Sequence, residues 1–215
     1  LIITNYNREK YVSRAISSCL NQLVNGIKVE TLVVDDASTD SSINIIQPFL
    51  ENIKLIKHDS NQGVSASSNS GIEHSQGKYI MRVDSDDFLS SYACQVMYMI
   101  LKNNPDYGFV YCDHIRVNEI GNRESLVRLD TSEKLYQHGA GILFSREALY
   151  SVNLYDTSIR NAEDYDLLIR LKKAKIKGFY LPVPLYRYYI HGANMTLNND
   201  RNQSVIDVKE KHKIK

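Results

Sequence analysis

Residues 78–88 read Lys78-Tyr-Ile-Met-Arg-Val-Asp-Ser-Asp-Asp-Phe88. A strand-favouring run in this stretch is followed at once by three aspartates, Asp84, Asp86 and Asp87. We expect the strand to be buried, which crowds three carboxylates at its end, where leaving them unpaired costs free energy. Mg²⁺ or Mn²⁺ would relieve the repulsion, because hard cations prefer oxygen ligands. The alternative is an acidic turn in front of a helix that begins near Ser90.

Composition indicates one globular domain with a sizeable core. The chain has 215 residues, of which 43% are hydrophobic and 24% are charged. Its net charge of +1 argues against nucleic acid as a main partner. No stretch approaches the roughly 20 apolar residues of a transmembrane helix, and no signal peptide is visible. Because the sequence starts with Leu1 rather than Met, we expect a segment of a longer protein.

The cysteine pattern indicates a reducing compartment. Cys19 and Cys94 fall in helical patterns and Cys112 in a strand pattern, and three cysteines cannot all pair with each other. We therefore expect buried, reduced thiols in a cytoplasmic protein, with the inner face of the membrane as an alternative location. The basic run 209–215, which Glu210 interrupts, is either a solvated tail or a peripheral contact for an anionic membrane.

Strands alternate with helices in the first part of the chain. The predicted strands are 1–6, 29–34, 53–57 and 79–83, with helices at 8–23, 41–50 and 64–75 between them. Asn7 is expected to cap the first helix, and the small, polar third helix to bring its backbone close to a ligand. The alternation predicts a parallel α/β sheet with a ligand crevice at the C-terminal ends of its strands. Three polar clusters, around Tyr6, Asp36 and Asp84, fall at those ends.

The second half of the sequence is less regular. We expect a helix at 91–102, a strand at 107–113, a turn at 119–122 with a returning strand at 125–129, a strand at 139–144 with a short helix from 146, and a helix at 163–174. Gly178 is expected to end that last helix. Pro182 and Pro184 predict an edge or irregular strand over 179–189. The polar residues 198–215 predict either a surface helix or a mobile tail.

Several short motifs, taken in order, resemble one protein family. They are Ile3-Thr-Asn-Tyr-Asn7, Val33-Val-Asp-Asp-Ala-Ser-Thr-Asp40, Asn61-Gln-Gly63, Asn69-Ser-Gly-Ile72, Arg82-Val-Asp-Ser-Asp-Asp87, Glu163-Asp164 and Tyr186-Arg-x-x-x-His191. Over residues 1–196 the chain resembles the family-two inverting nucleotide-sugar glycosyltransferases of the GT-A fold. The resemblance implies one Rossmann-like α/β domain, with a mostly parallel central sheet flanked by helices and a smaller antiparallel acceptor-side portion. It further implies a nucleotide-binding half (1–112), an acceptor-binding half (113–196) and a polar C-terminal tail or helix (197–215).

The resemblance also implies a reaction. A hexosyl or N-acetylhexosaminyl group would move from a UDP-sugar to a hydroxyl of a glycan, lipid-linked or protein-linked acceptor, with Mn²⁺ or Mg²⁺ as cofactor, in a bacterial cell-envelope polysaccharide pathway. Two alternatives stay open. A nucleotidyltransferase would want a glycine-rich phosphate loop, which the segment 4–8 lacks. A non-catalytic sugar-nucleotide-binding module would not need a complete set of ligands and a base.

The resemblance places the donor nucleotide on residues at the strand ends. Tyr6 would stack on uracil with Thr4 bonding beside it, and Asp36 would accept the N3–H of the base. The further donor-binding residues that it implies are Asn7, Arg8, Asn69 and Ser85. The alternatives are that Tyr6 is a core residue and that Asp35 and Asp36 cap the next turn or helix.

For the acidic loop, the resemblance implies a metal site and a ribose contact. Asp86 would bind the metal with His191 as second protein ligand, since neutral imidazole suits Mn²⁺. Asp84 would accept from ribose hydroxyls. Arg82 would either hold the donor's negative charge or serve as a structural ion-pair partner. The alternative for His191 is a structural histidine bonded to backbone.

Glu163 and Asp164 carry the implied chemistry. Asp164 would act as the general base, taking the proton of an acceptor hydroxyl as that oxygen attacks the anomeric carbon. Glu163 would bond the acceptor or the donor sugar. The alternative is that both acidic residues only complement the dipole at a helix N-terminus.

Overall fold

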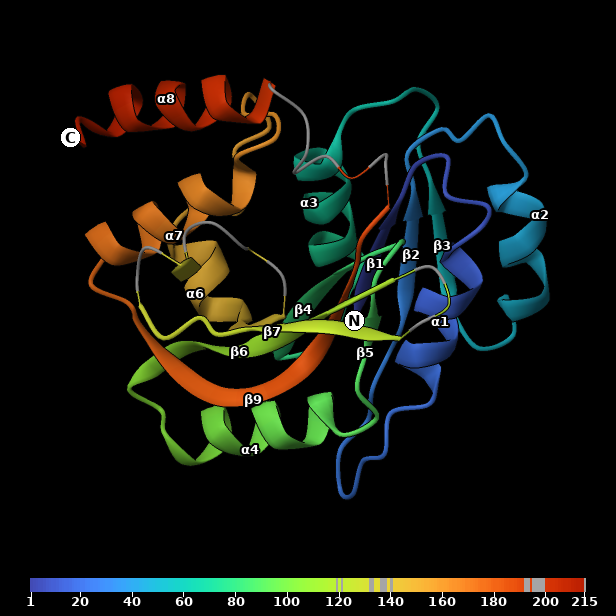
Figure 1. Ribbon diagram of the computed structural model, residues 1–215, viewed down its shortest axis with the longest axis horizontal. Helices are drawn as coiled ribbons and strands as arrows, with labels where there is room; N and C mark the ends of the chain where they lie inside the picture. Colours follow the sequence, from blue (N-terminus) through green and yellow to red (C-terminus); the bar gives the residue numbers. More distant parts are fainter. Residues whose placement is uncertain are drawn as a thin grey trace.

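Four parallel strands form one half of the sheet (Figure 1). In this computed structural model they are β1 (Ile2–Asn5), β2 (Leu32–Asp35), β3 (Lys54–Lys57) and β4 (Tyr79–Asp84), in the order β3-β2-β1-β4. All neighbouring pairs are parallel, as the alternation of strands and helices predicts. The register sets Asn5 beside Asp35 and Thr4 beside Asp84, so the polar strand ends lie level at one edge.

The structure describes residues 1–118, 120, 122–131, 134–135, 139, 141–191, 194 and 200–214. The helices among them are α1 (Val12–Leu20), α2 (Ser42–Ile46), the 3-10 helix η1 (Gln47–Phe49), α3 (Val64–His74), α4 (Ala93–Asn103), α6 (Arg146–Ser151), α7 (Glu163–Lys173) and α8 (Asp200–His212). The remaining strands are β5 (Phe88–Leu89), β6 (Tyr107–Val117), β7 (Arg123–Val127), β8 (Ile142–Ser145) and β9 (Lys177–Tyr189). The turn expected at 119–122 includes residues 119 and 121, which lie outside the described ranges.

Strand β8 carries the sheet into the second half of the chain. It pairs antiparallel with β4 on one side and with β6 on the other. Strand β7 returns antiparallel along β6, as expected, whereas β9 runs parallel to β6. The order over the described strands is β3-β2-β1-β4-β8-β6-β9-β5, so the second half is mixed rather than purely antiparallel.

Alternating side chains of the strands supply a hydrophobic core on each face of the sheet. On one face, Ile3 and Val33 pack with side chains of α1, α2 and α4. On the other, Ile2 and Val34 pack with side chains of α3, α6 and α7. This three-layer arrangement confirms the predicted α/β class and explains why the strands of the first half read as continuous apolar runs.

The first helix begins later than expected, and Asn7 does not cap it. Helix α1 starts at Val12, and the side chain of its N-cap residue, Tyr11, makes no capping hydrogen bond. Asn7 has a φ of 52°, and its Oδ1 accepts from the backbone N–H groups of Thr39 at 2.8 Å and Asp40 at 3.3 Å. The prediction was wrong because an amide oxygen can satisfy the backbone of a spatial neighbour as well as that of its own segment.

Small residues on α3 bring this helix close to the sheet. The helix packs on β1 and β2, and a Cβ on Gly71 would lie 2.3 Å from Cγ2 of Ile2. The Ser68 hydroxyl donates to the Val64 carbonyl at 2.7 Å, which satisfies it within the helix. The small residues therefore serve helix–sheet packing, and the first turn of α3, not its whole length, lines the cavity described below.

Strand β9 is irregular, as its prolines predict, but it lies inside the sheet. Strands β6 and β5 flank it, although β5 pairs only with Tyr186 and Arg187. Neighbouring residues Cys112 and Asp113 of β6 pair with Leu181 and Pro184, so the ladder skips Pro182, which has no N–H to offer. Among the described strands, Pro184 therefore pairs with β6 alone, and Pro182 has no pairing partner.

The segment between α7 and β9 differs from the prediction. Gly178 does not end the helix but lies within β9, where a Cβ would meet the Phe109 ring at 2.2 Å. The chain instead reverses at Lys175, which has a φ of 59°. The glycine is required by close packing rather than by backbone conformation.

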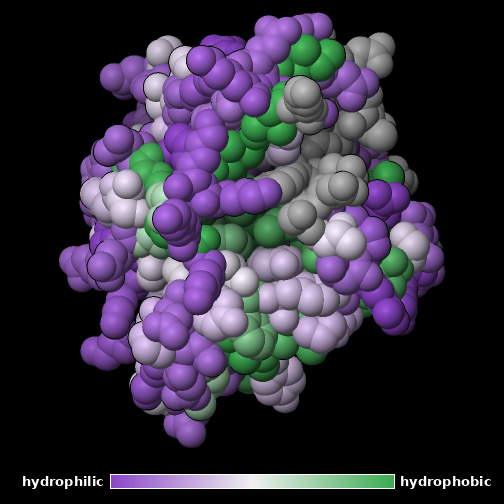
Figure 2. Space-filling view, turned by 90° about the vertical axis from the view of Figure 1, so that its left-hand side faces the viewer, coloured by the Kyte–Doolittle hydropathy of each residue, from purple (hydrophilic) through white to green (hydrophobic). Residues whose placement is uncertain are grey.

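Helix α8 packs on α7. Val208 is 1% exposed and packs with Ala162 and Ile169, so residues 200–212 form a docked helix. Figure 2 shows that hydrophilic side chains predominate on the face of the molecule that carries α7 and α8. None of the helices in the described ranges combines the length and the hydropathy that crossing a bilayer requires.

Candidate active site

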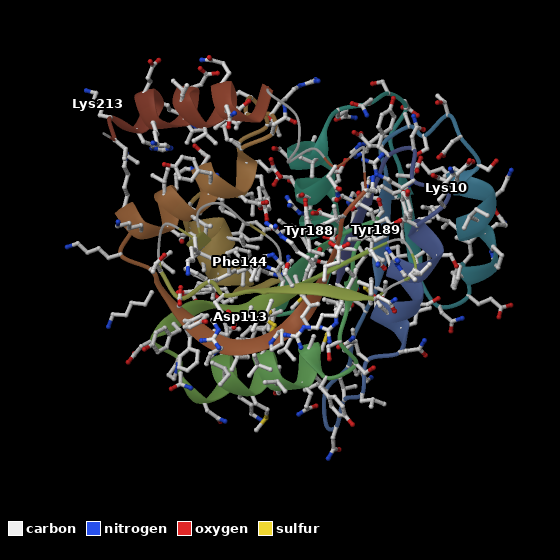
Figure 3. All side chains as sticks on the ribbon, in the orientation of Figure 1. Lys10, Asp113, Phe144, Tyr188, Tyr189 and Lys213 are labelled. Carbon is white, nitrogen blue, oxygen red and sulfur yellow. The ribbon has the colours of Figure 1, made fainter. Side chains whose placement is uncertain are left out.

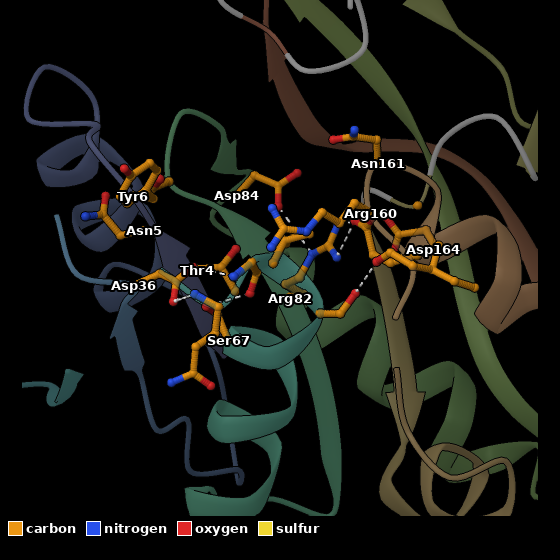
Figure 4. A pocket seen from close by; sticks show the side chains of 18 of the residues that line it. Thr4, Asn5, Tyr6, Asp36, Ser67, Arg82, Asp84, Arg160, Asn161 and Asp164 are labelled. Carbon is orange, nitrogen blue, oxygen red and sulfur yellow. Dashed lines mark hydrogen bonds and ion pairs between the residues drawn. The ribbon is translucent and has the colours of Figure 1, made fainter. Parts of the chain in front are cut away.

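A cavity of about 410 Å³ opens at the C-terminal ends of the parallel strands. Its walls include the ends of β1, β2 and β4, the first turn of α3, Tyr188 of β9, and residues 157 and 159–165, which lead into α7. Figure 4 shows Thr4, Tyr6 and Asp36 on one side, Asp164 on the other and Arg82 between them. The volume lies within the range of about 300–1,000 Å³ that small-molecule sites occupy.

The cavity collects most of the residues singled out from the sequence. Those that line it are Thr4, Tyr6, Arg8, Asp36, Arg82, Asp84, Ser85, Asp86, Glu163 and Asp164. Asn69 does not line it: its Nδ2 donates to the Tyr155 carbonyl at 2.8 Å and its Oδ1 accepts from the Tyr155 N–H at 3.0 Å. This clamp between α3 and the segment after α6 replaces the expected donor contact. Asn7 and His191 also lie outside the lining.

The structure gives Tyr6 a place in the cavity and Asp35 a structural role. Tyr6 is 43% exposed, so it is a cavity residue and not a core residue. Asp35 is buried and accepts from Asn5 Nδ2 at 2.7 Å, from Ser38 Oγ at 2.7 Å and from the Ser38 N–H at 3.0 Å. Asp35 therefore organises the turn after β2, which is the capping role considered for it.

Asp36 is the centre of a second hydrogen-bond group. Its Oδ1 accepts from the Gln62 N–H at 2.9 Å and contacts His58 Nδ1 at 2.7 Å, and its Oδ2 accepts from the Gly63 N–H at 2.7 Å. These bonds tie the loop that precedes α3 to the end of β2. A carboxylate has about four acceptor positions, so one remains for a ligand at the cavity wall.

The acidic loop is pinned to the end of β9. The Asp87 carboxylate is buried and accepts from the Tyr189 N–H at 2.8 Å. Burial raises the pKa of Asp87 well above its usual range, and the neighbouring Asp86 and Asp84 add to this shift. Figure 3 shows Tyr189 in the middle of the molecule at the end of β9. Asp87 thus does not cap a helix, because β5 intervenes before α4.

Asp86 and His191 come together although they lie 105 residues apart in the sequence. Asp86 Oδ2 lies 3.0 Å from His191 Nε2 and 3.1 Å from Arg8 Nε. Asn194 holds this histidine, since its Oδ1 accepts from the His191 N–H at 2.6 Å. His191 is therefore bonded to Asp86 of the acidic loop through its side chain and to Asn194 through its backbone.

The pair Asp86 and His191 fits a divalent cation as two adjacent ligands. Neighbouring ligands about 2.1 Å from one octahedral ion lie about 3 Å apart, which matches the 3.0 Å between Oδ2 and Nε2. Within the described residues, no group of three or more His, Cys, Asp or Glu could hold a metal. A cation here would thus need substrate oxygens to complete its shell, and Arg8 would have to give way.

Arg82 joins the two sides of the cavity. Its guanidinium contacts Asp84 Oδ1 at 3.2 Å, Glu163 Oε1 at 3.0 Å and Asp164 Oδ2 at 2.7 Å. Burial raises the pKa of Asp84, and the ion pair with Arg82 opposes that shift. Burial alone would lower the pKa of Arg82, but Asp164, Asp84 and Glu163 raise it well above its usual range. This geometry matches the ion-pair alternative for Arg82.

Some site residues escaped the sequence analysis. His58, Tyr155 and Gly139 each lie against a predicted site residue. His58 had a usable signal, because it directly follows β3 and so shares the edge of the sheet with Asp36. Gly139 had none, because nothing in its local sequence indicates that its backbone approaches α7.

Comparison with known proteins identifies the family. The model of "Glycosyl transferase family 2" matches residues 1–153. Chondroitin synthase of Escherichia coli is 28% identical over 212 residues, covering 92% of this chain but only 29% of that protein. The chain thus spans less than a third of this curated relative, and the family membership rests on the shared domain.

Solved structures share the fold. The structure of S. aureus TarS 1-349 in complex with UDP-GlcNAc has a TM-score of 0.80 at 19% identity and covers 98% of this chain and 65% of its own. The mannosyltransferase PcManGT from Pyrobaculum calidifontis, in complex with GDP-Man and Mn²⁺, has a TM-score of 0.77 at 18% identity, covering 98% and 62%. The sheet described above is therefore a GT-A sheet, and with the family model matching residues 1–153 this chain belongs to glycosyl transferase family 2.

Proposed function

We propose that this chain is a metal-dependent, inverting glycosyltransferase that uses a UDP-sugar donor and a hydroxyl acceptor on a glycan or a lipid- or protein-linked saccharide. One observation carries the proposal: the strand-end residues and the Glu163–Asp164 pair of α7 line a single cavity. In this proposal residues 1–112 bind the donor and residues 113–196 bind the acceptor. The named ligands of similar proteins, UDP-GlcNAc for TarS and a polysaccharide product for chondroitin synthase, support these substrate classes.

The donor would lie along the strand ends. The exposed ring of Tyr6 offers a face on which uracil can stack, and the remaining acceptor position of Asp36 suits the N3–H of that base. Asp84 is one-third exposed at its side chain and offers an acceptor for ribose hydroxyls. A divalent cation bound by Asp86 and His191 would supply Lewis-acid stabilisation of the leaving diphosphate. Arg8, released from Asp86, adds positive charge beside it.

Asp164 would perform the proton transfer. As the acceptor oxygen forms its bond to the anomeric carbon, the bond from that carbon to the UDP oxygen breaks, and the acceptor proton passes to the Asp164 carboxylate. Attack from the face opposite to UDP inverts the anomeric centre. Such general-base catalysis contributes about 10²–10⁴-fold to the rate.

The test is UDP release from a panel of UDP-sugars, with and without acceptor saccharides and Mn²⁺. We expect turnover that requires Mn²⁺, that Asp86→Ala abolishes, and that Asp164→Asn lowers by about 10²-fold or more. The exposed Asp59, outside the cavity lining, provides the matched control Asp59→Asn, which should retain activity. NMR of the product's anomeric proton reads the inversion. Full activity in both cavity variants would contradict the roles given to Asp86 and Asp164.

A further inference from the structure

Arg82 makes an unusual set of contacts for a residue in the middle of a buried strand. Each guanidinium nitrogen meets a different carboxylate: Nε contacts Asp84, Nη1 contacts Glu163 and Nη2 contacts Asp164. The Arg82 side chain is 10% exposed, and its guanidinium carbon lies 5.6 Å from the centre of the Tyr155 ring. The planar fork of arginine makes this three-way arrangement possible, whereas lysine would present a single point charge.

Arg82 offsets negative charge around Asp164. Two further carboxylates lie close to this ion pair: Asp84 at the end of β4, and Glu163, which precedes Asp164 in α7. Tyr155 faces the group from the segment after α6, and burial raises the pKa of this tyrosine, which keeps it neutral. Arg82 brings a positive charge within 2.7 Å of Asp164, and Arg160, which lines the same cavity, carries another. An opposite charge at this distance favours the ionised carboxylate.

Gly139 makes a second, independent contact with Asp164. A Cβ built on Gly139 would lie 1.9 Å from Asp164 Cγ and 2.1 Å from its Oδ2. The carboxylate therefore occupies the space that a side chain at position 139 would need. Any residue larger than glycine must displace either the carboxylate or the backbone.

We propose that Arg82 and Gly139 are positioning residues for Asp164. Arg82 fixes the carboxylate and holds it ionised, ready to receive a proton, and Gly139 leaves the room in which it sits. Because Arg82 also contacts Asp84, the proposed ribose ligand, it links the position of Asp164 to the part of the cavity that would hold the donor. The inference rests on the proposed role of Asp164 as general base.

The first test reads the protonation of Asp164 without turnover. In protein labelled with ¹³C at aspartate side chains, the Asp164 signal is assigned by its loss in Asp164→Asn, and its titration midpoint is compared in the unmodified chain and in Arg82→Gln. We expect the midpoint to rise by about one to three pH units in Arg82→Gln and much less in Arg82→Lys, which keeps the charge. An unchanged midpoint in Arg82→Gln would overturn the inference even if no sugar transfer is found.

The second test separates positioning from folding. Gly139→Ala leaves Arg82 intact but should displace Asp164, so we expect kcat to fall about tenfold or more with little change in the KM for the donor. Gly77→Ala is the matched control, because its nearest neighbour would be the Tyr79 carbonyl at 3.1 Å, away from the cavity. Equal kcat in Gly139→Ala and the unmodified chain would show that Asp164 does not need this space. Absence of turnover in the unmodified chain would instead count against the proposed function, while the titration still decides the role of Arg82.

Discussion

Asp86 is held by groups from both ends of the chain. Arg8 and His191 contact its Oδ2, and Arg14 Nη2 donates to its backbone carbonyl at 2.7 Å. These partners fix the orientation of a side chain that sits in a loop and would otherwise rotate. In the proposed metal site, a carboxylate oriented in this way would lose little conformational entropy on binding a cation.

Asn194 offers a test of this arrangement. Its amide bonds the His191 N–H and donates from Nδ2 to the Tyr189 carbonyl at 2.9 Å. We predict that Asn194→Ala weakens UDP binding in the presence of Mn²⁺ by about 10–100-fold, because His191 loses its support. Titration calorimetry with and without Mn²⁺ measures the effect. The exposed Asn52 provides the control Asn52→Ala, and an unchanged affinity of Asn194→Ala for UDP in the presence of Mn²⁺ would refute the prediction.

Predictability at this scale depends on whether a residue follows a recognisable element. Asp36 and Asp84 were predictable as cavity residues, because each ends an apolar run whose direction the alternation of elements fixes. Asn7 and Asn69 were not, because an amide serves equally well as a helix cap, a ligand contact or a clamp between segments. Only the fold decides which backbone lies within its reach.

At the scale of elements, α3 shows how composition can mislead. Its polar, small residues reduce its own hydrophobic contribution, yet they let the helix axis approach the sheet. The sequence pattern could not separate this close packing from contact with a ligand, since both require small side chains.

The contact between Gly71 and Ile2 predicts a clear stability effect. Gly71→Ala places a Cβ 2.3 Å from Cγ2 of Ile2, so we expect it to lower the free energy of unfolding by about 1–3 kcal/mol despite the better helix propensity of alanine. Urea denaturation measures the change. In the double variant with Ile2→Ala the two losses should be less than additive. Strict additivity would mean that the two residues do not meet.

The docking of α8 on α7 depends on Asp166. This fully buried carboxylate contacts Arg170 Nε at 2.6 Å, Lys211 Nζ at 2.8 Å and His212 Nε2 at 2.7 Å. Burial alone would raise the pKa of Asp166, but the hydrogen bonds from Lys211, His212 and Arg170 lower it. The ionised form is therefore the one that the folded protein stabilises.

The sign of the Asp166 shift gives a pH-dependent prediction. A depressed pKa in the folded state stabilises the protein above the unfolded value of about 3.9, and this contribution is lost as the pH falls through the folded pKa. We expect Asp166→Asn to cost about 2–4 kcal/mol at pH 7 and less below about pH 4. Denaturation at several pH values measures it. Asp207→Asn, an exposed change on α8, should cost less than about 0.5 kcal/mol at every pH, and a pH-independent loss in Asp166→Asn would contradict the assignment.

At the scale of the whole molecule, the two halves differed in how well they could be predicted. The parallel half follows from strand and helix alternation, because a right-handed crossover leaves few other arrangements. In the second half, the position of β9 between β6 and β5 depends on pairings between distant segments. Its prolines predicted an irregular strand but did not predict which strands would pair with it. The same long-range pairing brings His191 to Asp86. The residues of the candidate site were therefore easier to predict than the contacts between them.

The distribution of thiols provides a test of the fold as a whole. Cys19, Cys94 and Cys112 are free and buried, and burial raises the pKa of their thiols to about 12, about 11 and about 12. We predict that a disulfide reagent labels all three slowly in native buffer and rapidly in denaturant, because the thiolate is the reactive form. Mass spectrometry counts the labelled sites. Rapid native labelling of Cys112 would show that β6 is not covered as described.

The insertion of β9 between β6 and β5 has a consequence for biosynthesis. A nascent chain that has emerged only as far as residue 176 contains all the described strands of the sheet except β9, whose place is between β6 and β5. The parallel strands β1–β4 can assemble while translation continues, but His191, the partner of Asp86, reaches the acidic loop only after Tyr189 has left the ribosome. A ligand that contacts both Asp86 and His191 would therefore bind only to chains whose synthesis has passed residue 191.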